Sequence, residues 1–174
     1  MISRTERGNL GGMTLDSLDR IAEALGASVD LRLRWRGEQL DRLIDAAHAT
    51  IQQSVAELLT SLGWTVRVEV SFNHYGDRGR VDIVAFHPVN RIVVIVEIKS
   101  VLGDLQGTIG RIDVKVRLGQ QIARDLGWSG VQSIIPGLVI GDVRLARRTI
   151  AAHEALFARY DRRGRSAVAW LRRS

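Results

Sequence analysis

One strand-like stretch, Arg91–Ser100, most constrains how this 174-residue chain can fold. It reads RIVVIVEIKS, a continuous apolar run that ends in two charged residues. An apolar run this dense is typical of a strand that is covered on both faces. Because side chains alternate along a strand, Glu97 and Lys99 point to one face and Ile98 to the other. Buried charges need partners, so this end of the strand is a candidate site.

The segments around this strand predict an α/β (α+β) fold, with helices flanking a mixed β-sheet. Apolar spacing predicts helices over 15–25, 38–62, 105–126 and 144–160, and strands over 28–35, 64–72, 80–86, 133–140 and 166–171. Strand 133–140 is interrupted by Pro136-Gly137. Pro88 and Asn90 are turn residues, so strand 80–86 and the Arg91–Ser100 strand are predicted to form an antiparallel hairpin.

The composition excludes several classes of protein. With 45% hydrophobic residues the chain can bury a core, and without cysteine it has neither disulfides nor thiolate metal sites. It shows no signal peptide and no apolar stretch long enough to cross a bilayer. The sequence therefore predicts a cytoplasmic protein without a membrane partner.

The positive charge is concentrated at one end of the chain. The formal net charge is +6, and residues 142–174 carry nine arginines against three acidic residues. A basic end on an otherwise balanced chain suggests a polyanionic partner, most simply DNA. We expect Arg144, Arg147 and Arg148 to contact nucleic acid. The alternative is a solvated, arginine-rich surface.

Asp82 is the second acidic residue of the candidate site. If the hairpin loop spans Pro88–Arg91, Asp82 faces Glu97 on the neighbouring strand, and if the loop has only two residues, it faces Ile95. In either register its carboxylate lies within roughly 5–8 Å of the Glu97 position at Cβ. Asp82, Glu97 and Lys99 are therefore expected to converge at one end of the sheet.

Two facing carboxylates repel, and one takes up a proton unless a cation lies between them. Mg²⁺ (or Mn²⁺) would offset this repulsion, because hard divalent cations bind carboxylates, water and phosphate oxygens. Such an ion lowers the pKa of a bound water, and a nearby ammonium such as that of Lys99 can orient that water. The alternative is structural, with Asp82 in a surface salt bridge and Glu97 paired with Lys99.

Asp82 followed by Glu97-Ile98-Lys99, on two strands of an α-β-β-β-α-β arrangement, resembles the PD-(D/E)xK nuclease superfamily. The resemblance covers roughly residues 38–141, and Val81 stands where the name-giving proline would be. It implies that Asp82 and Glu97 bind Mg²⁺ and that Lys99 assists the attacking water.

Other residues follow from the same resemblance. RecB-type members place a histidine ligand on the first helix, where His48 lies close to the apolar stripe. The alternative is a core histidine. Glu57 on that helix and Glu69 on the first strand are rival acids. In this superfamily the helix after the catalytic strand often presents polar residues to the phosphate, which implies a nucleic-acid contact for Lys115 and Gln120. The alternative is a solvated helix face.

The first residues form a different region. Residues 2–8 and 14–26 resemble the back half of a Cro/repressor-type helix-turn-helix domain, without its scanning helix and most of its reading helix. The combination resembles actinobacterial-type regulator proteins in which such a domain precedes a PD-(D/E)xK-like region. We therefore expect a remnant over residues 1–36, a possible dimerisation arm that makes a homodimer, and a nuclease-like domain over 37–174.

Three functions fit these residues. The leading hypothesis is a Mg²⁺-dependent DNA endonuclease that hydrolyses phosphodiester bonds with Asp82, Glu97 and Lys99. The second is a DNA-binding transcriptional regulator whose nuclease-like domain is catalytically inactive and serves as scaffold or dimerisation module. The third is a protein-interaction module without nucleic-acid affinity.

Overall fold

The computed structural model describes residues 12–27, 29, 38–141 and 144–174 of the chain. The chain divides into two units, Met1–Gly37 and Glu38–Ser174. In the first unit, helix α2 spans Leu15–Ala24, and the Thr14 hydroxyl accepts a hydrogen bond from the Ser17 amide at 3.3 Å. The predicted helix is confirmed. The predicted strand over 28–35 lies outside the described residues except for position 29, so the helix-turn-helix remnant stays a prediction.

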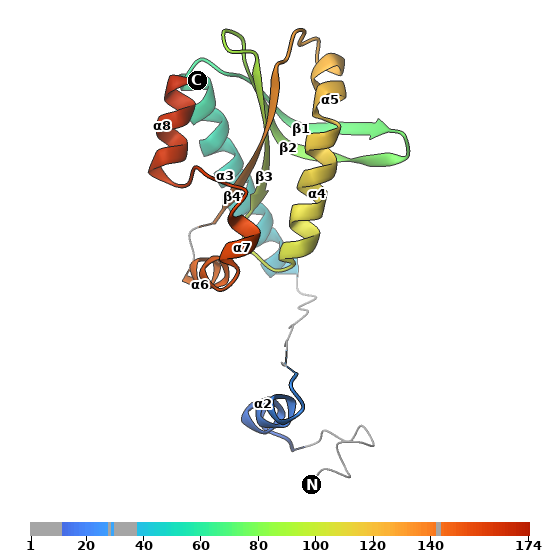
Figure 1. Cartoon of the computed structure of the whole chain (residues 1–174), viewed down its shortest axis with the longest axis vertical. Coiled ribbons are helices and arrows are strands. Elements are labelled where there is room, and N and C mark those ends of the chain that lie inside the picture. The colour runs from blue at the N-terminus through green and yellow to red at the C-terminus, as the bar shows by residue number, and fades with distance from the viewer. Residues whose placement is uncertain (1–11, 28, 30–37, 142–143) are drawn as a thin grey trace. The chain divides into compact units, whose positions relative to one another are not determined.

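The second unit is a mixed sheet flanked by helices (Figure 1). Its elements are α3 (Glu38–Ser61), β1 (Thr65–His74), β2 (Asp77–His87), β3 (Ile92–Lys99), α4 (Leu105–Arg117), α5 (Gly119–Asp125), β4 (Ser133–Ile140), α6 (Arg144–Ala152), α7 (Glu154–Phe157) and α8 (Arg165–Arg173). The described strands run in the order β1-β2-β3-β4. β1, β2 and β3 pair antiparallel, and β4 pairs parallel to β3. The predicted mixed α/β fold is confirmed at this level.

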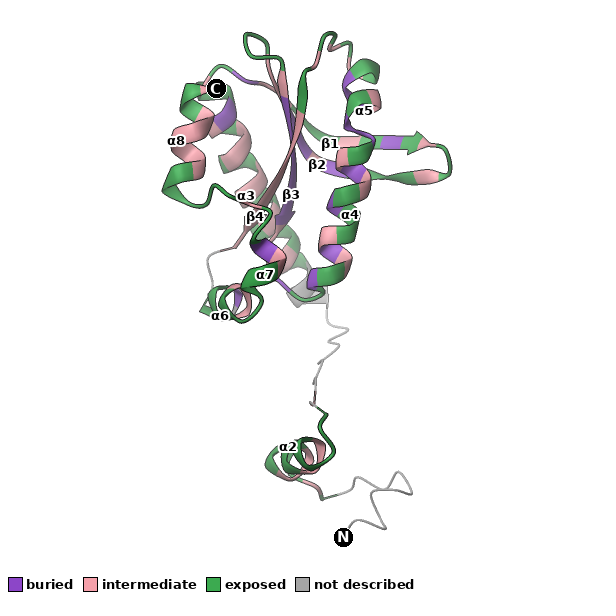
Figure 2. Cartoon of the chain, in the orientation of Figure 1, coloured by how far each residue is buried: buried purple, intermediate pink, exposed green. Residues whose placement is uncertain are grey.

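Strand β3 is the buried centre of the sheet, as its apolar run predicts (Figure 2). Every residue from Val93 to Ile98 is buried. Its two faces contribute to two apolar clusters, one with Leu59 of α3 and the other with Ile122 and Ala123 of α5. The sheet is therefore covered on both faces.

The β2–β3 hairpin has the longer of the two predicted loops. Ile83 pairs with Val96 and His87 with Ile92, so the loop spans Pro88–Arg91. In this register the last pair at this end is Ile83 with Val96, and the next position is Asp82 on β2 and Glu97 on β3. The hairpin thus brings both carboxylates to one end of the sheet.

Two predicted helices are each broken into two. The helix over 105–126 is interrupted at Leu118, where α4 ends and α5 begins. At Gly119 a Cβ would lie only 2.6 Å from Ile134 Cγ2, so the glycine lets the chain approach the sheet closely. The helix over 144–160 is broken at His153 into α6 and α7.

Two strand predictions also need correction. The strand over 166–171 is wrong, because this segment is helix α8, and the indole N–H of Trp64 donates to its Leu171 carbonyl. Short apolar runs do not distinguish a strand from a buried helix. β4 is not interrupted at Pro136-Gly137 but continues through it. It is an edge strand, where a missing backbone N–H is tolerated.

Among the helices that the structure describes, none has the length and apolar character needed to cross a bilayer.

Candidate functional site

Asp82 lies at the end of the sheet with little compensation for its charge. Its Oδ2 accepts a hydrogen bond from the Ile98 amide at 2.6 Å, and its side chain is 14% exposed. His48 Nε2 on α3 lies 4.0 Å from its Oδ1, beyond hydrogen-bonding distance. Burial raises the pKa of Asp82, the Ile98 hydrogen bond opposes this rise, and the neighbouring Glu97 charge adds to it.

A third side chain completes this part of the site. His48, Glu69 of β1 and Asp82 each offer one ligand atom, and these atoms all lie within 4.8 Å of one another. We call these three residues the acid–histidine group. They come from three different elements, so the tertiary fold alone brings them together.

Glu69 reaches this position through an unusual backbone. Its φ is +53°, a left-handed conformation that residues other than glycine rarely adopt, and least of all within a strand. Its carboxylate accepts from Arg80 Nη1 at 2.5 Å and from Gln52 Nε2 at 2.7 Å. Arg80 first and Gln52 second hold the pKa of Glu69 below its usual value. Glu69 therefore stays ionised next to Asp82.

Gln52 links two members of the acid–histidine group. Besides the bond to Glu69, the same Nε2 donates to the backbone carbonyl of Asp82 at 2.9 Å. It lies one helical turn after His48 on α3, so the two side chains project from the same face of the helix. Gln52 thus ties β1 and β2 to α3 at the site.

Glu97, in contrast, has two lysine partners. Lys99 Nζ donates to its Oε1 at 2.7 Å, and Lys115 Nζ of α4 donates to its Oε2. Glu97 is 3% exposed and Lys115 7%. Burial alone would raise the pKa of Glu97, but the hydrogen bonds from Lys115 and Lys99 outweigh it and leave the pKa below its usual value. We call these three residues the glutamate–lysine group.

The acid–histidine group has a donor set that suits a divalent cation. Two ligands of one Mg²⁺ or Mn²⁺ lie at most about 4.2 Å apart, twice a bond of roughly 2.1 Å. The present separations, within 4.8 Å, would need only a small contraction. Two carboxylates and an imidazole fit Mn²⁺ at least as well as Mg²⁺, because Mg²⁺ prefers oxygen ligands alone.

The predicted site residues are only partly brought together. His48 lies near Asp82, and Lys99 pairs with Glu97, but the ligand atoms that cluster are those of His48, Glu69 and Asp82. Of the two rival acids, Glu69 belongs to this cluster. The other, Glu57, is exposed and accepts a hydrogen bond from Gln53, one turn earlier on the same helix. A ligand role for Glu97 stays a prediction, and it would require Glu97 to release a lysine.

The predicted nucleic-acid contacts lie in different places. Lys115 is buried against Glu97, and Gln120 donates to the Val131 carbonyl at 3.2 Å. Arg144, Arg147 and Arg148 are exposed on α6. Their contacts with nucleic acid stay predictions. The sequence reasoning missed Gln52 altogether, although its spacing of four from His48 on a helix was a usable signal.

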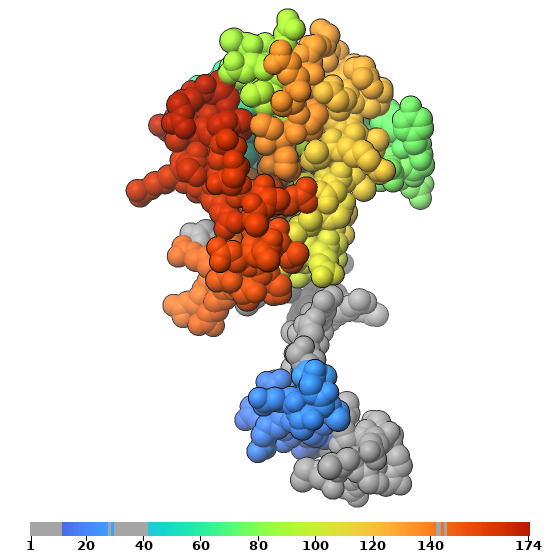
Figure 3. Space-filling model, viewed as in Figure 1, coloured from blue at the N-terminus to red at the C-terminus, as the bar shows by residue number. Residues whose placement is uncertain are grey.

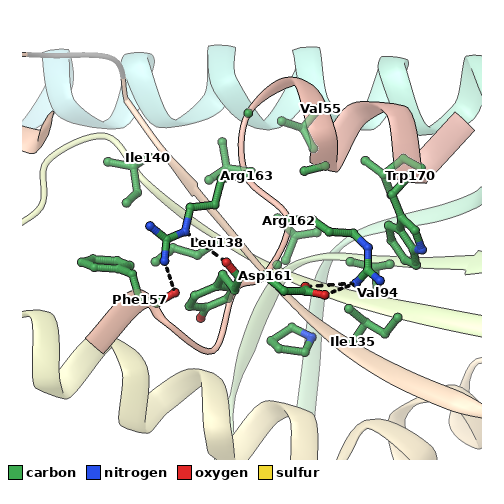
Figure 4. A pocket seen from close by; sticks show the side chains of 18 of the residues that line it. Val55, Val94, Ile135, Leu138, Ile140, Phe157, Asp161, Arg162, Arg163 and Trp170 are labelled. Atoms are coloured by element: carbon green, nitrogen blue, oxygen red, sulfur yellow. Dashed lines mark hydrogen bonds and ion pairs between the residues drawn. The ribbon is translucent and has the colours of Figure 1, made fainter. Parts of the chain in front are cut away.

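A separate cavity of about 390 Å³ lies between the sheet and the C-terminal segment (Figure 4). Its lining is mainly apolar and includes Val55, Val94 and Ile135. The guanidinium of Arg163 closes one side by donating to the carbonyls of Phe157 and Tyr160. This lining offers no cluster of cation ligands among the described residues, so the candidate site remains at the end of the sheet.

No protein-family model matches the chain, and no curated protein is significantly similar to it in sequence. The assignment of a function therefore depends on the geometry of the site.

Proposed function

We propose that the protein is a metal-dependent nuclease that hydrolyses phosphodiester bonds of DNA. The observation that carries this proposal is Asp82, a half-buried carboxylate of raised pKa that has no cation at hydrogen-bonding distance among the described residues. With His48 and Glu69 it forms a ready set of cation ligands. A bound Mg²⁺ or Mn²⁺ would supply charge stabilisation for the phosphodiester and acidify a water molecule.

The order of elements supports the same proposal. The order α3-β1-β2-β3-α4-α5-β4 fits the α-β-β-β-α-β order that the PD-(D/E)xK resemblance implies, with its second helix broken into α4 and α5. Asp82 lies on the second strand of this unit and Glu97-Ile98-Lys99 on the third, as that resemblance requires. Fold alone does not establish activity, so the roles of individual residues matter more.

The glutamate–lysine group supplies positive charge to the site. Glu97 pairs with the ammonium groups of Lys99 and Lys115, and the charge of Lys115 acts on Asp82. Lys99 has a side chain that is 26% exposed, so its ammonium can orient an attacking water or contact a phosphate oxygen. Lys115 is buried and serves to position Glu97.

One observation favours a second function. Both carboxylate oxygens of Glu97 are occupied by lysines, so the site is charge-paired at this carboxylate without any metal. A DNA-binding regulator with a catalytically inactive nuclease-like domain fits this pairing. In that case the exposed arginines of α6 would bind phosphates.

A cleavage assay separates the two functions. Supercoiled plasmid and linear duplex DNA are incubated with the full chain and Mg²⁺ or Mn²⁺, alongside Asp82→Asn and Lys99→Met. The nuclease predicts cleavage by the wild type that is faster with Mn²⁺ and is lost in both variants. Glu57→Gln, which changes an exposed carboxylate of α3, is the matched control and should cleave normally. DNA binding without cleavage, or cleavage unaffected by Asp82→Asn, contradicts the nuclease.

A further inference from the structure

Strands β1 and β2 extend beyond the sheet as a two-stranded ribbon. They pair with each other from Thr65 and Phe86 to His74 and Asp77, but β2 pairs with β3 only over residues 83–87. Residues 70–81 therefore leave the sheet as a hairpin, which we call the ribbon (Figure 1). Its base adjoins Glu69 and Asp82, so it emerges directly from the candidate site.

One face of the ribbon is fixed to the body of the protein. Phe72 and Val81 are buried in the cluster that includes Ile122 of α5. Near the tip, His74 Nε2 lies 2.7 Å from Asp125 Oδ2, and Arg117 Nη2 donates to Asp77 at 2.7 Å. In Figure 3 the ribbon stands out beside α4 and α5. These contacts hold it in one orientation.

The opposite face is polar, basic and open to solvent. Asn73 pairs across the strands with Arg78, and Ser71 with Arg80, and all four residues are exposed. Arg78 makes no ion pair or side-chain hydrogen bond within the part of the chain that the structure describes. The ribbon thus presents a free guanidinium next to an amide.

The tip presents an aromatic side chain at a conformational cost. Tyr75 is 97% exposed and adopts φ +53°, and Gly76 follows at φ +86°. A tight hairpin turn of this kind normally takes asparagine or glycine at the first position. A bulky residue kept in such a conformation, with its ring in solvent, suggests a contact with a partner.

We propose that the open face of the ribbon binds the major groove of duplex DNA. That groove, about 12 Å wide, admits a two-stranded ribbon, and its edges are read by arginine at guanine and by asparagine at adenine. Arg78 and Asn73 would make these contacts, while the Tyr75 hydroxyl donates to a phosphate. The proposal rests on DNA being the substrate. The tip lies about 20 Å along the strand from Glu69, six residues at roughly 3.3 Å each, so the contacted bases lie near the site.

The test uses DNA binding in EDTA, where cleavage plays no part. Duplexes selected by the full chain from a random-sequence pool are titrated with wild type, Arg78→Ala, Asn73→Ala and Tyr75→Asn. Asparagine suits the backbone of the turn, so this last variant removes only the ring. We expect Arg78→Ala to weaken binding about tenfold or more, and methylation of guanine N7 to block the wild type but not Arg78→Ala.

Arg124→Ala is the control, because it removes an exposed arginine of α5 whose guanidinium donates to Gln121 on the same helix, and it should bind like the wild type. Unchanged affinity in Arg78→Ala and Tyr75→Asn overturns the ribbon proposal, as does tighter binding to single strands than to duplexes. If cleavage occurs while the ribbon variants bind normally, the nuclease stands and the ribbon proposal fails. If the ribbon variants lose binding but no DNA is ever cleaved, the ribbon proposal stands and the nuclease fails.

Discussion

Two carboxylates at the same end of the sheet have opposite electrostatic surroundings. Glu97 is almost fully buried, but two ammonium groups neutralise it. Asp82 is less buried, yet no ammonium or guanidinium lies at hydrogen-bonding distance from it among the described residues, and its neighbours include Glu69 and Glu97. The pKa of Glu97 is lowered and that of Asp82 is raised.

This difference in surroundings indicates that the charge of Glu97 is structural and that the charge of Asp82 is available for function. The glutamate–lysine group is complete without a ligand, so it should contribute to the folded state. In the acid–histidine group, Asp82 has no ammonium or guanidinium partner at hydrogen-bonding distance among the described residues, so this group should gain most from a divalent cation.

Removing the charge of Glu97 should destabilise the protein most. Glu97→Gln leaves the buried Lys115 without its counterion, and breaking a buried ion pair from one side typically costs about 3–5 kcal/mol. Urea denaturation should show this loss in the free energy of unfolding. Glu57→Gln on the exposed face of α3 is the control and should change it by less than about 0.5 kcal/mol. A loss that small in Glu97→Gln would mean that the glutamate–lysine group is not structural.

Mn²⁺ should stabilise the wild type through the acid–histidine group. At one hundred times the dissociation constant, a ligand that binds only the folded state adds about 2.7 kcal/mol. Thermal unfolding with and without Mn²⁺ should show this gain, and both His48→Ala and Asp82→Asn should abolish it. An undiminished gain in Asp82→Asn would place the cation elsewhere.

Gln52 should matter through the residues that it positions. Gln52→Ala removes the hydrogen bonds to Glu69 and to the Asp82 carbonyl. Loss of an outer partner of a metal ligand typically weakens metal binding about 10–100-fold. Calorimetric titration with Mn²⁺ should show this loss, while Gln53→Ala, whose amide donates to the exposed Glu57, should bind like the wild type. Equal affinities for the two variants would argue against the positioning role.

Asp82→Asn should stabilise the metal-free protein at neutral pH by roughly 0.5–2 kcal/mol, the usual range of stabilising substitutions. Because the folded-state pKa of Asp82 is raised, its ionisation costs stability as the pH rises from the unfolded-state pKa through the folded-state pKa. The gain of the variant should therefore appear over this interval, persist above it and vanish at lower pH. Urea denaturation in EDTA across this pH range measures it. A gain that is independent of pH would contradict the assigned cause.

Much of the fold follows from local patterns. The apolar run of β3 and the turn residues Pro88 and Asn90 predict the central hairpin and leave two registers open. The structure has the register with the longer loop. The helical stripe of α3 and the position of His48 follow from periodicity in the same way. These features depend on residues close in sequence, which is why the sequence alone could predict them.

The remaining features depend on contacts between distant segments. The sequence suggests strand pairing for the short apolar run of α8, whereas its packing against Trp64 gives a helix. From the sequence alone, Lys115 can be interpreted as a solvated helix residue. In the structure α4 packs against β3 and brings Lys115 to Glu97. Glu69 could be named as a rival acid, but its left-handed backbone has no signal in the sequence.

The most direct measurement is anomalous diffraction at the manganese edge from crystals of the full chain soaked with Mn²⁺. We predict a peak bound by His48, Glu69 and Asp82, with Glu97 still held by Lys99 and Lys115. A peak bound by Glu97 with its lysines displaced, or no peak at this end of the sheet, would contradict it.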